Sequence, residues 1–306
     1  MRRPVFGGLG VAAPLVAVLA VLPLVYSNQL LLFNFVMFLT LAQGLNVIYG
    51  FTGFLPFGYV GFFGAGAYGF AMAVMHLHAA PFPALALAGA ASVLLGCILA
   101  PMMRLTGAYF AIANLAAAQA LYQIVSNPAL QDLTKGPYGV SLSGVFAPGA
   151  TYAAALALLA ATLGLVIWLR SSRLGLALQA LRDDPVSAAM AGVSVVRMRT
   201  TAWLLSALVA GLSGGLFAWQ ISVFYPETVF DLSISIFAIV FTLFGGAGTL
   251  LGPVLGVLIL YGIYNAIGIS VPQYFQLIYG GLIVSLVLFL PNGLASLLTR
   301  QGFRVP

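Results

Sequence analysis

The chain has 306 residues, of which 62% are hydrophobic and only 5% are charged, whereas soluble proteins carry roughly 25% charged residues. This composition excludes a tethered soluble enzyme and predicts an integral membrane protein with one transmembrane domain, residues 1–306. The net charge of +6 comes from basic residues spread between apolar runs, so it does not indicate nucleic-acid binding.

Long stretches that are apolar on every face predict an all-α, polytopic fold. Residues 84–103 and 151–169 lack the alternation of a transmembrane β-strand. A helix needs about 20 apolar residues to cross a ~30 Å hydrocarbon core, so the chain has room for about ten crossings. The expected crossings are residues 9–26, 30–49, 56–75, 84–103, 108–125, 151–169, 200–220, 233–249, 252–269 and 276–293.

The first crossing follows Arg2 and Arg3 and has the layout of a signal peptide. Further hydrophobic segments follow at once, so we expect an uncleaved first helix. Ten crossings place both termini on one side of the membrane. That side would hold ten of the eleven basic residues and the other only Lys135, which predicts cytoplasmic termini because Arg and Lys concentrate in cytoplasmic loops.

Neutral polar residues gather near the end of the second crossing. Gln43 and Asn46 are three residues apart, on one helix face, just before a glycine-rich break at residues 50–58. Non-helical backbone at membrane depth occurs where protein or a water-filled path covers it, so the break predicts a solute pathway. Bonding between helices is the alternative role for such groups. The candidate pathway residues are Gln43, Asn46, Thr52, Gly53, Tyr59 and Asn114.

Two loops between crossings are long enough to have a function. The outer loop, about residues 126–150, is rich in turn residues and could receive a partner. The inner loop, about residues 170–199, is the most polar stretch of the chain. Within it Asp184 is suited to cap a helix, Pro185 to begin it and Gly192 to close it. We therefore expect two short helices to which a soluble protein could bind.

Several kinds of chemistry are absent from the sequence. The only lysine, Lys135, is in the outer loop, and no phosphate-binding loop occurs, so ATP must be handled by another chain. The expected crossings contain no carboxylate that could exchange a proton. The single Cys97 excludes an intrachain disulfide, and His76 and His78 are expected to be ordinary interfacial residues. A second glycine-rich break at residues 245–248 leads towards Gly252 and marks another candidate pathway segment.

Five motifs occur in the order typical of a known family. They are Gly44 to Gly53 with Phe62 to Tyr68, Gly107 to Ala113, Gly136 to Val140, Arg182-Asp183-Asp184 through Gly192, and Phe244 to Pro253. At these residues the chain resembles the M-type membrane subunits of bacterial ABC importers for branched-chain amino acids. The resemblance extends over residues 44–293.

The resemblance implies a ten-helix permease of the bacterial inner membrane that has no catalytic site or cofactor of its own. It implies a second permease, usually the H-type subunit, and a periplasmic binding protein that delivers the solute. Two cytoplasmic ATPase subunits would bind ATP and Mg and would contact the inner loop. The residues implied in ATPase coupling are Arg182, Asp183, Asp184, Pro185, Ala188 and Gly192.

The expected function is therefore uptake of branched-chain amino acids or a related small polar solute, such as urea, an amide or an aromatic acid. Two positions depart from the family. Tyr59 stands where a histidine is frequent, which weakens the case for a leucine-type substrate, and Ala189 stands where an acidic residue is common. An ATP-independent carrier or channel for a small neutral solute is the alternative. An intramembrane enzyme would need a nucleophile with a base or a metal cluster, and the sequence shows neither.

Overall fold

The computed structural model describes residues 3–270, 280–281, 284 and 294, and nearly all of its regular structure is helical. The long helices are α1 (Arg3–Val25), α2 (Gln29–Leu45), α3 (Val60–Leu77), α4 (Pro81–Ile98), α5 (Ala108–Val125), α7 (Pro148–Ser171), α10 (Val195–Ile221), α12 (Leu232–Gly245) and α13 (Leu251–Ser270). The short elements are helices α6 (Gln131–Thr134), α8 (Arg173–Asp183), α9 (Pro185–Met190) and α11 (Pro226–Val229), and strands β1 (Val140–Ser141) and β2 (Val223–Phe224).

Seven segments in the described part of the chain are long and apolar enough to cross a membrane. Two shorter apolar helices, Gly10–Val25 and Leu251–Ala266, accompany them. The first nine expected crossings each overlap one of these helices, whereas the tenth, residues 276–293, lies almost wholly outside the described residues. The chain is thus an all-α, multi-pass membrane protein, and the total of about ten crossings stays a prediction.

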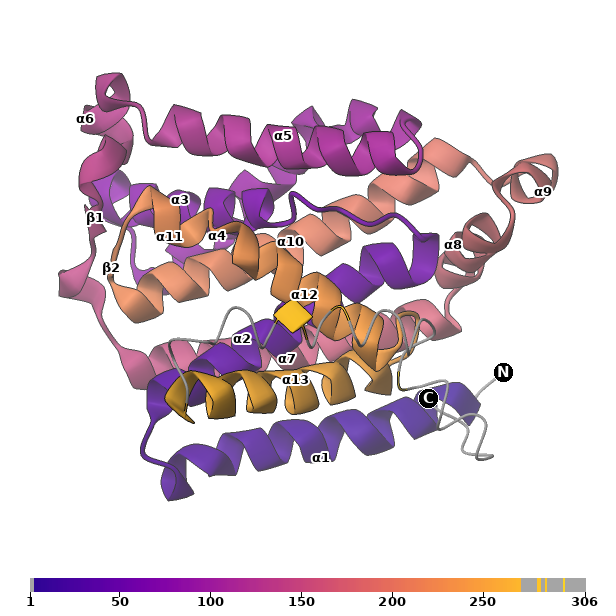
Figure 1. Ribbon diagram of the computed structural model, residues 1–306, viewed down its shortest axis with the longest axis horizontal. Helices are drawn as coiled ribbons and strands as arrows, with labels where there is room; N and C mark the ends of the chain where they lie inside the picture. Colours follow the sequence, from indigo (N-terminus) through magenta and orange to yellow (C-terminus); the bar gives the residue numbers. More distant parts are fainter. Residues whose placement is uncertain (1–2, 271–279, 282–283, 285–293, 295–306) are drawn as a thin grey trace.

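The helices run side by side in a bundle whose centre is α10 (Figure 1). Helix α10 packs most extensively against α3 and α4 and also contacts α2 and α7, while α5 and α1 lie at opposite edges. Small residues permit the close approach, because a Cβ on Gly66 would clash with the carbonyl of Gly211 and one on Gly214 with the carbonyl of Phe63. Any larger side chain at these positions would separate α3 from α10.

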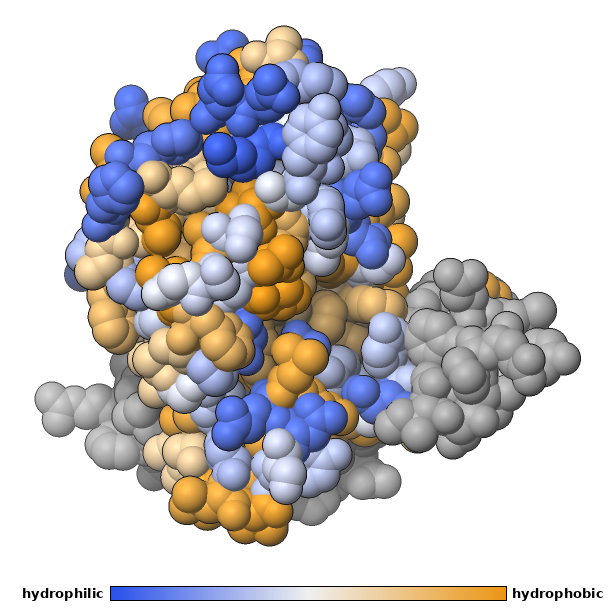
Figure 2. Space-filling view, turned by 90° about the vertical axis from the view of Figure 1, so that its left-hand side faces the viewer, coloured by the Kyte–Doolittle hydropathy of each residue, from blue (hydrophilic) through white to orange (hydrophobic). Residues whose placement is uncertain are grey.

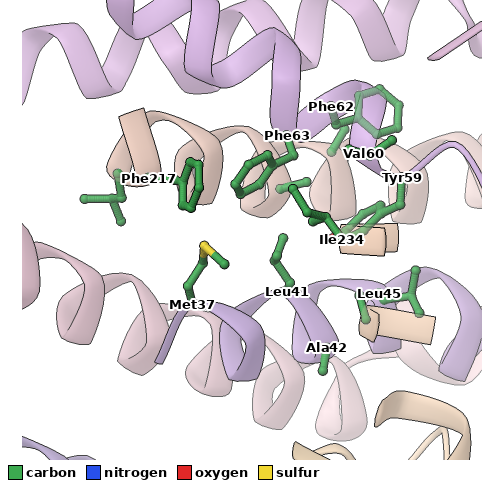
Figure 3. Packing of buried hydrophobic residues seen from close by; sticks show 14 of the residues in the cluster. Met37, Leu41, Ala42, Leu45, Tyr59, Val60, Phe62, Phe63, Phe217 and Ile234 are labelled. Atoms are coloured by element: carbon green, nitrogen blue, oxygen red, sulfur yellow. The ribbon is translucent and has the colours of Figure 1, made fainter. Parts of the chain in front are cut away.

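The core is filled by aliphatic side chains from α2 that face aromatic side chains from α3 and α10 (Figure 3). Met37 and Leu41 of α2 lie opposite Phe63 and Phe217, whose ring centres are 5.3 Å apart. Trp203 of α10 packs edge-on against Phe62 with ring centres 4.7 Å apart, and its indole N–H donates to the carbonyl of Gly96. The space between α2 and α10 is therefore filled by closely packed side chains.

The loop between α5 and α7 is ordered by turns, as expected, at the left-hand end of Figure 1. It holds three 3-10 turns and α6, and its strand β1 pairs antiparallel with β2, with Val140 opposite Phe224. The Trp219 indole N–H donates to the carbonyl of Val145 at 2.7 Å, which ties the loop to α10. Figure 2 shows this end of the molecule, with hydrophilic residues gathered in its upper part, where α6 lies in Figure 1.

Helices α3, α4 and α12 are among those whose boundaries differ from the sequence prediction. Helix α3 begins at Val60 and not at residue 56, because the backbone turns at Gly53, whose φ is +75°. Helix α4 begins earlier, at Pro81, and its last expected turn, Ala100–Arg104, is a 3-10 helix. Helix α12 stops at Gly245 and not at residue 249, because Gly246 and Gly248 have positive φ angles that a helix cannot accommodate.

Candidate functional site

The first break follows directly from the way α2 ends. Residues Asn46–Gly50 form a wider π-helical turn, and the helical backbone stops after Thr52. The Thr52 hydroxyl donates to the carbonyl of Ile48 at 2.6 Å and accepts from the N–H of Phe54 at 3.3 Å. Gly53 then turns the chain with its positive φ. The break is therefore an ordered turn, held by its own side chains.

The second break joins α12 to α13 through another ordered turn. Gly246 and Gly248 have φ angles of +112° and +86°, which favour glycine. The Thr249 hydroxyl donates to the carbonyl of Gly246 and accepts from the N–H of Gly252, both at 2.9 Å. Both breaks thus consist of a glycine turn stabilised by a threonine.

The two breaks contact each other through two amide side chains, that of Gln43 on α2 and that of Asn46 at the start of the π-helical turn. Asn46 accepts from the N–H of Gly248 at 2.7 Å and donates to the carbonyl of Thr249 at 2.9 Å. Gln43 donates to the carbonyl of Leu250 at 2.8 Å, and both amides are completely buried. They satisfy backbone groups that the second break leaves unpaired, each of which would cost roughly 1–3 kcal/mol if buried without a partner. In this structure the amide pair holds the breaks together.

Arg182 of α8 reaches the place where the two breaks meet. Its Nη1 donates to the carbonyl of Gly50, at the C-terminal end of the π-helical turn. A cation is favoured there because helix C-termini carry partial negative charge. A Cβ on Gly248 would lie only 2.7 Å from the same nitrogen, and a Cβ on Gly50 would lie 2.7 Å from the N–H nitrogen of Gly248. Glycine at position 248 therefore leaves the space in which the arginine binds, and glycine at position 50 leaves room for the hydrogen bond between Asn46 and Gly248.

The inner loop folds into two short helices, as the sequence predicts. Asp184 caps α9 by accepting from the N–H of Val186 at 2.9 Å, and it also accepts from the Ser187 hydroxyl. The Ser187 hydrogen bond, with that from Val186, holds the pKa of Asp184 below its usual range. Gly192 has a φ of +87°, and the next N–H, of Val193, donates to the carbonyl of Ala188 at 3.0 Å. This geometry is the Schellman closure of a helix.

Tyr59 and Asn114 lie where α3 begins. The Tyr59 hydroxyl donates to the carbonyl of Ser206 at 3.2 Å, and the side chain is buried in the hydrophobic core (Figure 3). The Asn114 oxygen accepts from the N–H of Gly58 at 2.7 Å. Four of the six candidate pathway residues, Gln43, Asn46, Thr52 and Gly53, thus lie in or beside the first break, and the other two lie at the start of α3. Among the six, only Gly53 is exposed in this structure.

Three polar residues at the breaks were not singled out by the sequence. Ser206 donates to the carbonyl of Gly44 at 2.8 Å, and Ser235 accepts from the N–H of Val60 at 2.7 Å. Arg199 is buried on α10, where its guanidinium carbon lies 4.2 Å from the centre of the Phe54 ring. Single serines in apolar helices give no signal by themselves. Arg199 gives no signal either, because it stands beside Arg197, Thr200 and Thr201, just before the apolar run of α10, like a residue of the polar loop.

Within the described residues, no group of three or more His, Cys, Asp or Glu side chains could hold a metal ion. His76 lies with its Nε2 2.9 Å from the carbonyl oxygen of Leu133, in contact with the outer loop. The structure brings together two helix breaks, a buried amide pair between them, and an arginine from the helix pair α8–α9.

The chain is similar to known proteins over most of its length. The family model for the branched-chain amino acid transport system permease component matches residues 28–287. The high-affinity branched-chain amino acid transport system permease protein LivM of Salmonella typhimurium is 29% identical over 296 residues, covering 86% of this chain and 69% of LivM, and Escherichia coli LivM gives the same figures.

More distant relatives match part of the chain. The L-arabinose ABC transporter permease protein AraH of Azospirillum brasilense is 32% identical over 127 residues, covering 40% of this chain and 38% of AraH. No solved structure matches the chain. Because the family model and the LivM proteins both cover most of its length, the chain belongs to the permease components of branched-chain amino acid transport systems.

Proposed function

We propose that this chain is the membrane-spanning permease subunit of an ATP-driven ABC importer for branched-chain amino acids. A related small polar solute, such as urea, an amide or an aromatic acid, is the wider substrate class. The match to LivM over 86% of the chain supports the narrower class, and the partial match to a sugar permease supports the wider one. The chain would translocate solute without a catalytic site or cofactor of its own.

The partners in this proposal are those that the family resemblance implies, and the absence of a phosphate-binding loop from the sequence supports separate ATPase subunits. A second permease of the H-type would complete the pathway, a periplasmic binding protein would deliver solute at the outer loop, and two ATPase subunits would bind ATP and Mg. The helix pair α8–α9 is the proposed ATPase contact on the cytoplasmic side, with both termini on that side of the inner membrane. Its end presents Val186 and Met190, which are 68% and 86% exposed and available to a groove in a partner.

The contact between Arg182 and Gly50 is the observation that carries the coupling proposal. It joins the helix pair to the first break, and the break is joined to the second through Asn46 and Gln43. A displacement of α8 by the ATPases would pull the arginine from the Gly50 carbonyl and free the two breaks to separate. The arrangement described here is then the closed one, and the pathway opens where the amide pair now lies.

ATP dependence tests this proposal against the alternative of an ATP-independent carrier or channel. Proteoliposomes would hold the permease pair, the ATPases and the binding protein, with ionophores that collapse all ion gradients. We expect uptake of a branched-chain amino acid that persists with ATP inside and stops without it. The long helices as described carry no Asp or Glu that could bind and release a proton, and Glu227 and Asp231 lie before α12, at one end of its span. Uptake that vanishes with the gradients, or proceeds without ATPases, would favour the carrier.

The proposal also predicts that buried residues beside the first break become accessible to solvent during transport. In a variant with Cys97 replaced by alanine, single cysteines at positions 43, 46 and 59 should be unreactive in the closed arrangement, where these residues are at most 1% exposed. They should react with a charged thiol reagent in at least one nucleotide state. A cysteine at the equally buried Leu39 is the matched control and should stay unreactive throughout. If all three positions resist labelling in every state, the solute passes elsewhere.

A further inference from the structure

A small pocket lies at the end of the molecule that carries the loop between α5 and α7, away from the helix pair α8–α9 (Figure 1). The end of α5, this loop and the start of α11 form its wall, with the residues Tyr122, Ser126, Pro137, Tyr225, Pro226 and Glu227. Its volume is about 80 Å³, well below the roughly 300–1,000 Å³ of pockets that enclose a small-molecule ligand. The pocket therefore suits the tip of a single side chain.

Contacts between these segments fix the wall of the pocket. Strand β1 of the loop pairs with β2, which directly precedes Tyr225. A Cβ on Gly139 would lie 2.8 Å from the Tyr225 ring, so this ring packs closely against the backbone of the loop. On α5, the Tyr122 ring packs against Phe230 with ring centres 6.1 Å apart. The pocket is thus preformed, which lowers the entropic cost of filling it.

Glu227 is the one charged residue among the six that line the pocket. It is exposed, and its carboxylate forms no ion pair or hydrogen bond with the described part of the chain. Tyr122 and Tyr225 contribute aromatic surface, which attracts a cation as well as an apolar group. The pocket therefore favours one cationic group on an apolar stem.

The surface around the pocket has the composition of a protein interface. Tyr138, Val223 and Tyr225 are each at least 49% exposed, and they lie in segments that connect the long helices. Figure 2 shows this end of the molecule, where hydrophobic and hydrophilic residues lie side by side. Tyrosine is enriched where proteins dock, because its ring buries a large apolar area while its hydroxyl keeps a hydrogen bond. The pocket and its surroundings thus indicate a protein partner.

A lysine side chain matches this pocket better than other cationic groups do. Its ammonium is a compact charge on a flexible four-carbon stem, so the charge can pair with Glu227 while the stem contacts the tyrosine and proline side chains. An arginine guanidinium is planar and needs more room than an ammonium. A free amino acid carries a carboxylate beside its ammonium, and Glu227 would repel that carboxylate.

We propose that this pocket binds a lysine side chain of the periplasmic solute-binding protein when that protein docks. Glu227 pairs with the ammonium, and Tyr138, Val223 and Tyr225 bury apolar surface against the partner around it. The inference rests on the proposed transport function and adds to it the place at which the binding protein is held.

The first test measures docking of the binding protein to the complete transporter in nanodiscs. The readout is the concentration of solute-loaded binding protein that half-maximally stimulates ATP hydrolysis. We expect Glu227→Gln to raise this concentration about fivefold, as for the loss of a partly exposed ion pair. The melting temperature should not change, since Glu227 pairs with no described residue. Asp132→Asn is the matched control and should dock like the parent, because Asp132 is exposed on α6 at the same end but does not line the pocket.

A charge exchange identifies the lysine. Each surface lysine of the binding protein is replaced in turn by glutamate. One replacement should weaken docking to the parent about tenfold, and the same replacement should restore docking to the Glu227→Lys transporter, because the exchange rebuilds the ion pair. Butylammonium chloride carries the stem and the charge of a lysine side chain. It should inhibit docking to the parent more strongly than sodium chloride at the same ionic strength, but no more strongly than sodium chloride with Glu227→Gln.

The outcomes separate this contact from other occupants of the pocket and from the proposed function. If Glu227→Gln docks like the parent, or no lysine exchange restores docking, the proposed contact is wrong. If docking is unchanged while half-maximal uptake needs more solute, the pocket binds the ammonium of the solute. If Glu227→Gln has an effect only in nanodiscs that contain phosphatidylethanolamine, the pocket binds a lipid headgroup. Each of these results overturns the lysine contact and leaves the transport function standing, whereas a parent complex without ATP-driven uptake would overturn the proposed function itself.

Discussion

Replacing Gly50 by alanine is expected to abolish transport and to destabilise the protein by about 1–3 kcal/mol, the usual range for overpacking a filled site. The added Cβ would clash with the side-chain oxygen of Asn46 and lie 2.7 Å from the nitrogen of Gly248. These two atoms form the hydrogen bond that joins the breaks, so the methyl group would push them apart. Uptake by proteoliposomes and the melting temperature of the purified permease pair would measure the two effects.

Gly262→Ala is the matched control for this substitution. It adds the same methyl group to an apolar helix, α13, at a position where no other described segment comes within 4 Å of the new Cβ. We expect nearly unchanged uptake and melting temperature for it. A Gly50→Ala protein that transports and melts like the parent would show that the breaks do not pack as described here.

Arg182→Ala is expected to lower the amount of solute moved per ATP hydrolysed by about tenfold or more. The substitution removes the side chain that connects α8 to the Gly50 carbonyl, so hydrolysis in the ATPases would no longer displace the first break. The ratio of uptake to hydrolysis separates this effect from a loss of folded protein, which lowers both rates together. Arg182→Lys should restore part of the ratio, because a single ammonium group can still approach the carbonyl.

Two comparisons test whether the effect belongs to this contact. Arg173→Ala removes an exposed arginine from the same helix and should leave the ratio unchanged. Gly248→Ala places a Cβ 2.7 Å from the Arg182 nitrogen and should mimic the loss of the arginine. Because both changes break one contact, their effects should not add in the double variant. A normal ratio in Arg182→Ala would mean that coupling runs through other residues.

The sequence predicted those parts of the molecule that depend on neighbouring residues. Apolar runs placed helices at the first nine expected crossings, because each helix satisfies its own backbone hydrogen bonds. The start and the end of α9 were predicted from Asp184, Pro185 and Gly192, since a cap acts within a single helical turn. Helix boundaries next to the breaks were less accurate, because the glycines permit several turn conformations.

The sequence also placed Gln43 and Asn46 on one helix face but could not show what they bind. Their partners, Leu250 and Gly248, are separated from them by 207 and 202 residues. Such pairing depends on how α2 packs beside α12 and α13, which no local pattern encodes. The proposed role of these amides in the solute pathway stays a prediction that the labelling experiment tests.

The amino-acid sequence by itself determined that the chain lies in a membrane, where its helices fall and how its inner loop is capped, because burial of apolar runs and capping are local. Only the tertiary structure decided that the two breaks meet, that Arg182 binds the carbonyl of Gly50 and that Arg199 is buried against Phe54. These contacts join segments from different helices. Their geometry is set by the glycines that let the backbones approach, and it exists only once the bundle is packed.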